Sequence, residues 1–346
     1  MKKWLAALFA IVMMSISFQP AFAAESEEYD LDRFYPADVD GHWASDVLDD
    51  FIQADLIKGY AENEDIYIKP DANITRAEFV AILLRAASPS VEQNANNSNT
   101  YADVKPGDWF YAVVNEAKAL GIVNGIDAAH FAPHQKISRA EISAILSRFF
   151  SETIDFNGTA ASFTDIAKHW AKTDIEKLSK AGITGGYQDG TFRPQKTATR
   201  AEAVALLSRA FHKESGQLPD DDTLVDLIKK SSQEQYEALE SGSFDQIKTS
   251  IDKYNVGFAR DAQLYSADLI QSYQESGMII GYNAVGEMKG RVLSKSDRFA
   301  TVDIAGGEVE VTITQGKNVT TTTMAGDATY CLRKTQDGWK IYGVEE

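Results

Sequence analysis

The sequence has one cysteine, Cys331, among 346 residues, with five histidines and eight prolines. A single cysteine excludes a disulfide-stapled scaffold and any zinc or iron–sulfur site built from cysteines. Five histidines leave little material for a histidine-rich metal centre, so we expect no metal and no cofactor. Basic residues are outnumbered, 34 against 51 acidic ones, which gives a formal charge of −17. That charge disfavours attraction to nucleic acid or to anionic lipid, so an anionic ligand would need a local group of donors.

The overall composition is that of a folded protein. Hydrophobic residues make up 44% and charged residues 25% of the chain, which is typical of globular domains and too apolar for a disordered chain. At roughly 150 residues per domain, the length predicts two domains or three small ones.

The N-terminus predicts export. Lys2 and Lys3 precede an apolar run over residues 4–18, and Ala21-Phe22-Ala23 forms a small-x-small cleavage site. A transmembrane anchor is the alternative, but the run is shorter than the ~20 apolar residues that a membrane span needs. We therefore expect a signal peptide over residues 1–23, an acidic linker over 24–34, and no membrane insertion after cleavage.

Three copies of one unit occupy residues 35–87, 101–150 and 161–211. In each copy a tryptophan precedes an arginine at a spacing of 33, 30 and 30 residues, a register that chance does not produce. Polar connectors at 88–100, 151–160 and 212–222 are interpreted as linkers. Each copy has the apolar spacing of helix, loop, helix, and one copy is too small to bury both helices alone. We therefore expect an all-α assembly in which three repeats close one core in a pseudo-threefold arrangement.

The second helix of each copy starts with Thr/Ser-Arg-Ala-Glu. The hydroxyl residue and the glutamate match a capping box and need no further function. The arginine is different, because a cation at a helix N-terminus opposes the helix dipole, yet it recurs in all three copies. It can form an anion site together with the free helix amides, or it can pair with an aspartate of the neighbouring repeat. The arginines are Arg76, Arg139 and Arg200, and the aspartates are Asp38, Asp103 and Asp165.

A tryptophan opens the first helix of each copy: Trp43, Trp109 and Trp170. Such residues can belong to the core, or they can stack on the apolar face of a sugar ring beside a polar groove. Together with arginine and aspartate, they suit an acidic carbohydrate better than a phosphate-rich polymer.

These units resemble S-layer homology domains, the triplicated wall-anchoring modules of bacterial surface proteins. The third copy carries nearly the whole signature, with His169-Trp170-Ala171, residues 186–194 (GYQDGTFRP) and Thr199-Arg200-Ala201-Glu202. The first copy lacks the Asp-Gly-Thr-Phe turn, and the second has no tyrosine after Gly125. The resemblance implies a three-pronged helical fold whose grooves bind pyruvylated secondary cell-wall polysaccharide at the bacterial cell surface. It also implies that the three arginines contact the ketal carboxylate and that the aspartates, the tryptophans and Gly186 line the grooves.

Residues 223–346 form a different module. Helical periodicity over 223–239 and 244–251 and a third apolar stretch precede β-patterned segments at 298–304, 309–313, 319–324, 329–332 and 339–342. This order predicts an α+β domain with a curved antiparallel sheet. With residues 236–245 and the closing Asp-Gly-Trp-Lys-Ile-Tyr, it resembles the nuclear transport factor two superfamily.

The leading hypothesis is a non-enzymatic wall-anchored protein that displays a C-terminal binding domain whose partner the sequence does not identify. A wall-associated enzyme or small-ligand-binding protein is the alternative, and a lattice-forming protein is the third. No histidine follows His212, and the carboxylates Asp297, Asp303 and Glu310 are interpreted as solvated. We therefore expect no catalytic residues and a buried, unreactive Cys331.

Overall fold

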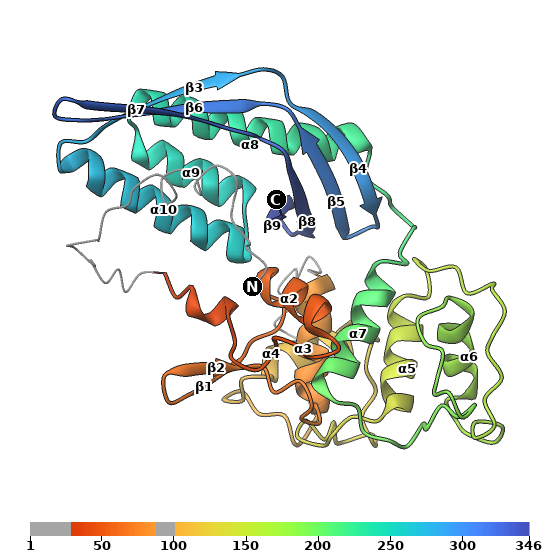
Figure 1. Cartoon of the computed structure of the whole chain (residues 1–346). Helices are drawn as coiled ribbons and strands as arrows, with labels where there is room; N and C mark the ends of the chain where they lie inside the picture. Colours follow the sequence, from red (N-terminus) through yellow and green to blue (C-terminus); the bar gives the residue numbers. More distant parts are fainter. Residues whose placement is uncertain (1–28, 88–100, 346) are drawn as a thin grey trace.

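The computed structural model describes residues 29–87 and 101–345. The expected signal peptide and the expected linker at 88–100 lie outside these residues. A helical half made of the repeats is followed by an α+β half, and the two lie against each other (Figure 1).

Each repeat contributes two helices, as predicted. The first helices are α2 (Ser45–Gln53), α4 (Tyr111–Ala119) and α6 (Lys172–Lys180). The second helices are α3 (Arg76–Ala87), α5 (Arg139–Phe149) and α7 (Arg200–Phe211). The second helices are buried along most of their length because apolar or small residues cover nearly every face.

The predicted capping boxes are confirmed. Ser138 and Thr199 accept hydrogen bonds from the amides of Glu141 and Glu202, and each glutamate accepts from the cap amide in return. Thr75 and Glu78 exchange the same pair of bonds. The cap fixes where the helix begins, so the following arginine stands at its first turn in every repeat.

The all-α expectation is wrong in repeat 1. Strands β1 (Tyr60–Glu62) and β2 (Asp65–Tyr67) form an antiparallel hairpin there. Asn63 turns the chain with φ of 59°, a conformation that asparagine tolerates better than most residues. This hairpin replaces the glycine-containing turn that the first copy lacks.

The C-terminal half has its helices first and its strands second, as predicted. A short 3₁₀ helix, η1 (Asp32–Phe34), precedes the repeats, and α8 (Asp221–Ser241), α9 (Phe244–Tyr254) and α10 (Gly257–Glu275) follow them. The strands are β3 (Ile279–Val285), β4 (Lys289–Lys295), β5 (Phe299–Ala305), β6 (Glu308–Gln315), β7 (Asn318–Met324), β8 (Ala328–Thr335) and β9 (Gly338–Glu345).

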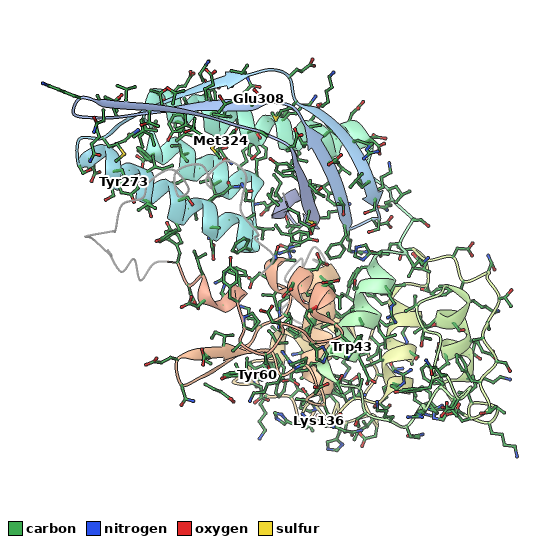
Figure 2. All side chains as sticks on the ribbon, viewed as in Figure 1. Trp43, Tyr60, Lys136, Tyr273, Glu308 and Met324 are labelled. Carbon is green, nitrogen blue, oxygen red and sulfur yellow. The ribbon has the colours of Figure 1, made fainter. Side chains whose placement is uncertain are left out.

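These strands make two antiparallel sheets instead of one. Their orders are β3-β6-β7 and β4-β5-β8-β9. The three helices lie along the long strands (Figure 1). Tyr273 of α10 and Met324 of β7 pack against one apolar cluster (Figure 2). Leu224 and Ile228 of α8 belong to a second cluster.

The two halves share apolar packing. The core of the repeats includes three residues of the C-terminal half, Phe258, Phe299 and Tyr342. Phe299 stacks on Phe51 of α2 at 6.5 Å between ring centroids and contacts Phe211 of α7 in a tilted arrangement at 5.6 Å.

The segment 212–222 joins the halves and is held at several points. Glu214 is buried, accepts a hydrogen bond from Thr153 at 3.0 Å and forms an ion pair with Arg298. Gly216 and Gln217 donate their amides to Asp297. The interpretation of Asp297 as solvated is therefore wrong, because this carboxylate is buried and bound by backbone donors.

Among the residues that the structure describes, no helix combines the length and the apolar character that a membrane crossing requires. Cys331 is half-buried on β8, and burial raises the pKa of its thiol to about 12. The thiol is therefore protonated at neutral pH.

Candidate functional site

The three arginines at the starts of α3, α5 and α7 are buried. Arg76, Arg139 and Arg200 are only 4%, 6% and 3% exposed. A buried guanidinium is costly unless its charge and its N–H groups find partners. The partners therefore show what each arginine does.

Each arginine reaches into the next repeat, and the series closes on itself. The Nε of Arg76 donates to the carbonyl of Phe131 in repeat 2 at 2.9 Å, and that of Arg139 donates to Phe192 in repeat 3 at 3.0 Å. The Nε of Arg200 in repeat 3 donates to the carbonyl of Ile68 in repeat 1 at 2.7 Å, so the three bonds form a closed cycle. One arginine thus lies at each of the three boundaries between repeats.

The main chain repeats this pattern. The amides of the same arginines donate to carbonyls of the next repeat, namely Gln135, Lys196 and Ala72, at 2.9–3.0 Å. These three acceptors therefore hold equivalent places in repeats 2, 3 and 1. The four-residue tetrad joins neighbouring repeats through both its backbone and its side chain.

The aspartates act within their own repeats. Asp103 accepts hydrogen bonds from the amides of Phe131 at 2.9 Å and Ala132 at 2.7 Å. Burial alone would raise the pKa of Asp103, but these amides bring it below its usual range. Asp165 binds the amides of Phe192 and Arg193 in the same way, and Asp38 binds those of Ile68 and Lys69.

This arrangement gives the aspartates a positioning role. Each one fixes the turn whose carbonyl accepts the Nε of the neighbouring arginine. The second residue of that turn has a positive φ, 58° at Ala132, so the turn needs support. None of the three aspartates pairs with an arginine of the tetrad. The sequence therefore identified the three aspartates as candidates but did not predict that they bind backbone amides of their own repeats.

At two boundaries the outer nitrogens of the arginine are already bound. Arg76 donates from Nη1 to Glu141 at 2.6 Å and from Nη2 to the carbonyl of Asn124 at 3.1 Å. Arg200 donates from Nη1 to the Tyr60 hydroxyl at 3.1 Å and from Nη2 to the carbonyl of Lys58 at 2.9 Å. The Tyr60 hydroxyl in turn donates to Glu78.

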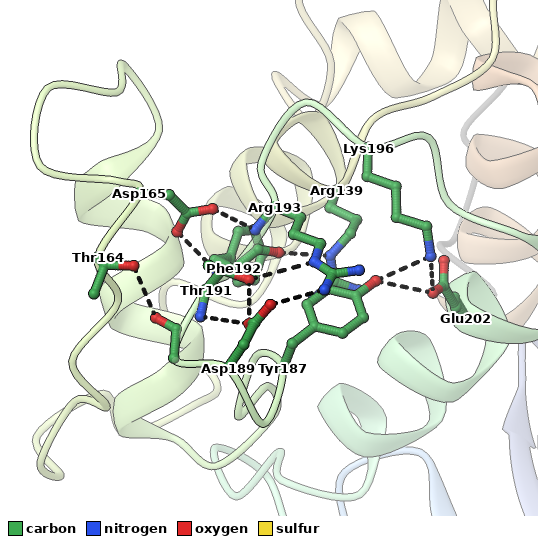
Figure 3. Close-up of polar contacts among 11 residues, drawn as sticks. Arg139, Thr164, Asp165, Tyr187, Asp189, Thr191, Phe192, Arg193, Lys196 and Glu202 are labelled. Atoms are coloured by element: carbon green, nitrogen blue, oxygen red, sulfur yellow. Dashed lines mark hydrogen bonds and ion pairs between the residues drawn. The ribbon is translucent and has the colours of Figure 1, made fainter.

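The boundary between repeats 2 and 3 is different. Within the described ranges, 29–87 and 101–345, neither Nη of Arg139 has a hydrogen-bond partner. The guanidinium lies over the rings of Tyr187 and Phe192, 4.9 and 4.6 Å from their centroids. Glu202, the acid equivalent to Glu141, instead accepts a hydrogen bond from Lys196 (Figure 3). Arg139 therefore has donors available for an external acceptor.

The tryptophans are exposed. Trp43, Trp109 and Trp170 have 63%, 60% and 63% of their surface open to solvent, so the core interpretation does not describe them. Two of them lie beside a histidine ring, His42 and His169, each at 5.5 Å between centroids. Exposed indole faces are available for stacking on a sugar ring.

Gly186 stands where a side chain has no room. Its φ is +71°, and a Cβ there would lie 2.4 Å from the Phe163 ring and 2.7 Å from the carbonyl oxygen of Thr191. The glycine allows this turn to close next to Tyr187, the residue that stacks on Arg139.

Sequence reasoning missed four participants: Tyr60, Glu141, Tyr187 and Lys196. The signal for the two tyrosines and the lysine is the difference between the copies, because the repeats diverge at these positions while keeping the arginine. Glu141 carries no such signal, because every copy has a glutamate there and the capping box accounts for it. In the part of the chain that the structure describes, no group of three or more histidine, cysteine or acidic side chains is placed to hold a metal ion.

Three segments of the chain match the S-layer homology domain: residues 37–80, 100–142 and 162–204. The chain is 32% identical over 168 residues to cell surface glycoprotein 1 of Acetivibrio thermocellus, covering 45% of this chain and 7% of that protein. It is 32% identical over 164 residues to the cellulosome-anchoring protein of the same organism, covering 46% and 36%. It is 27% identical over 210 residues to the S-layer protein sap of Bacillus anthracis, covering 60% and 24%. The chain thus spans about a third or less of these relatives.

The domain matches and these relatives indicate a secreted protein of the bacterial cell surface, as the sequence predicts. Among solved structures, the intermembrane space region of the chloroplast protein ARC6 aligns with a TM-score of 0.29 and 16% identity, covering 37% of this chain and 95% of that chain. A putative dehydratase of the NTF2-like family from Streptomyces avermitilis aligns with a TM-score of 0.25 and 18% identity, covering 36% and 96%. Scores this low carry no argument, so the second resemblance stays a prediction.

Proposed function

We propose that this chain, which carries three S-layer homology domains, attaches non-covalently to a pyruvylated secondary cell-wall polysaccharide and displays residues 223–346 as a binding or interaction domain. The ligand chemistry is a carboxylate on a sugar ring. The protein groups that would recognise it are a guanidinium for the carboxylate and an exposed indole for the ring.

The observation that carries this proposal is the state of Arg139. A guanidinium held at its Nε by the Phe192 carbonyl keeps its orientation, while its two Nη groups have no hydrogen-bond partner among the described residues. Two parallel N–H groups match a carboxylate in bidentate geometry. Because the site is largely buried, such a pair would be stronger than one on an open surface.

The cyclic bonds between repeats support a pseudo-threefold arrangement with one groove at each boundary. The three arginines then occupy equivalent positions, and the boundary between repeats 2 and 3 takes the ligand carboxylate most readily. The chain as a whole remains acidic, so this local donor group has to overcome an unfavourable overall field.

For residues 223–346 we propose a non-enzymatic role. A specific feature favours the alternative of small-ligand binding: an open pocket of about 470 Å³ at the boundary of the two halves, lined by residues that include Asp55, Glu116 and Lys340. Glu116 places a buried carboxylate oxygen there that has no hydrogen-bond partner in the described part of the chain. Protein-observed NMR with a small-molecule library would test this alternative independently of wall binding.

Sedimentation with purified wall sacculi, before and after removal of the pyruvylated polymer, tests the main proposal. Arg139→Gln is expected to lower the pelleted fraction at least fivefold. Arg209→Gln, which changes an arginine bound to its own repeat, serves as the matched control. Thermal unfolding of each variant verifies the fold.

A second measurement needs no variant. A soluble methyl hexoside with a pyruvyl ketal should displace the protein from sacculi, whereas the same glycoside without the carboxylate should not. Equal displacement by both glycosides, or pelleting that persists without the polymer, would overturn the proposal.

A further inference from the structure

The capping-box glutamate of each repeat faces the arginine of the preceding repeat, but at three different separations. Glu141 pairs directly with Arg76 at 2.6 Å. Glu78 lies 3.7 Å from Arg200, and the Tyr60 hydroxyl stands between them. Glu202 makes no ion pair with Arg139 within 4 Å in the described part of the chain.

The position equivalent to Lys196 differs between the repeats. Lys196, Gln135 and Ala72 are equivalent because each carbonyl accepts the amide of the preceding repeat's arginine. Only Lys196 among the three has a cationic side chain. Its Nζ donates to Glu202 at 2.9 Å and to the Tyr187 hydroxyl at 3.0 Å, and that hydroxyl lies 3.3 Å from Glu202 (Figure 3).

Lys196 and Glu202 are both charged at neutral pH. The hydrogen bonds that Lys196 donates to Tyr187 and Glu202 raise the pKa of Lys196. Burial alone would raise the pKa of Glu202, but the hydrogen bonds from Lys196 and from the amide of Thr199, with a smaller contribution from the nearby charge of Arg139, bring it below its ordinary value. Lys196 thus neutralises Glu202. At the boundary between repeats 1 and 2, the equivalent acid, Glu141, instead neutralises Arg76.

We propose that Lys196 is a positioning residue that keeps the groove between repeats 2 and 3 open by holding Glu202 away from Arg139. Where glutamine stands in its place, at Gln135, the glutamate closes onto Arg76 and occupies the position that a ligand carboxylate would take. At these two boundaries, the side chain at this one position therefore determines whether the arginine can accept an acidic sugar. The ligand class rests on the proposed function; the movement of Glu202 does not.

The test exchanges the two residues. Lys196→Gln should let Glu202 pair with Arg139, and a crystal structure of the variant should show the carboxylate within hydrogen-bond distance of an Nη. Calorimetric titration with the methyl hexoside pyruvyl ketal should show affinity reduced about tenfold. Gln135→Lys should release Glu141 from Arg76, and a crystal structure of this variant should show the two side chains separated.

Lys196→Gln could lose affinity only because a positive charge is removed, and this effect must be distinguished from pairing of Glu202 with Arg139. The double variant Lys196→Gln with Glu202→Gln should recover most of the affinity, because a neutral glutamine still caps the helix but no longer attracts Arg139. Lys168→Gln, an exposed lysine of the same repeat, controls for net charge and should bind as the parent does.

The outcomes separate the two proposals. If the parent protein does not bind the ketal, the proposed function fails, while the crystal structure of Lys196→Gln still shows whether Glu202 moves. If the parent binds, the inference is overturned by unchanged affinity in Lys196→Gln, by an unmoved Glu202, or by a double variant as weak as the single one.

Discussion

The hydroxyl of Tyr342 on β9 donates a hydrogen bond to the carboxylate of Asp50 on α2, which lies 292 residues earlier in the chain. This bond joins the last strand of the C-terminal half to the first helix of repeat 1. Phe299 packs beside it against rings from both halves. The wall-binding repeats and the displayed domain therefore share part of one core.

Removing the Phe299 ring should uncouple the two halves. Phe299→Ala is expected to lower the free energy of unfolding by about 3–5 kcal/mol, because the ring is almost fully buried at the boundary. Calorimetry should show one transition in the parent and a broadened or split transition in the variant. Ile279→Ala, at an exposed position on β3, should change little. A single transition of unchanged midpoint in Phe299→Ala would contradict a shared core.

The half-buried Asp50 should make stability depend on pH. Burial raises the pKa of Asp50, although the Tyr342 hydrogen bond and His212 oppose this. The folded protein then binds the proton more tightly, so the stability contributed by this group falls as pH rises from about 4, its unfolded pKa, through the folded value.

Asp50→Asn keeps an acceptor for Tyr342 and removes the charge. Relative to the parent, this variant should gain stability between about pH 5 and pH 8 in urea unfolding. A difference between the two proteins that stays constant over this interval would show that Asp50 has an ordinary pKa.

Two glycines of repeat 3 separate steric from backbone effects. Gly190→Ala meets no atom within 4 Å at φ of +77° and should cost about 1 kcal/mol from backbone strain. Gly186→Ala has a similar φ but would also contact the Phe163 ring and the Thr191 carbonyl, so we expect about 2–4 kcal/mol. Chemical denaturation of both variants measures the difference, and equal losses would contradict the steric contribution.

The turn held by Asp103 should be sensitive to amidation. Asp103→Asn would place an NH₂ group or a single neutral oxygen where two amides now meet a carboxylate, at a cost of about 1.5–3 kcal/mol. Because its pKa is lowered in the folded protein, the contribution of Asp103 should disappear as pH falls through that folded pKa, so parent and variant should converge in acid. Asp40→Asn, at an exposed position, is the control.

The exposed tryptophans should report on ligand binding. Replacing Trp43, Trp109 or Trp170 by alanine is expected to change stability by less than about 1 kcal/mol, because these side chains are mostly in solvent. Wall glycan should protect them from acrylamide quenching in the parent protein. Quenching that is identical with and without glycan would place the binding surface elsewhere.

Local patterns in the sequence were sufficient for the elements and for the candidate residues. Apolar spacing located both helices of every repeat, and the tetrad located the three arginines, because capping and amphipathic periodicity act within one or two turns. The helices-then-strands order of the C-terminal half followed from the same local signals. The hairpin β1–β2 was missed because its turn depends on Asn63 and on few other residues.

Only the tertiary structure decided what these residues contact. Arg76, Arg139 and Arg200 have the same local sequence, yet their outer nitrogens have different surroundings. Nη1 of Arg76 binds Glu141 and Nη1 of Arg200 binds the Tyr60 hydroxyl, each from another repeat. The outer nitrogens of Arg139 have no protein acceptor in the described residues. Likewise, Asp297 became a buried acceptor because segment 212–222 returns to it. Such contacts join residues far apart in the chain, and a charge's environment depends on those distant neighbours more than on its own motif.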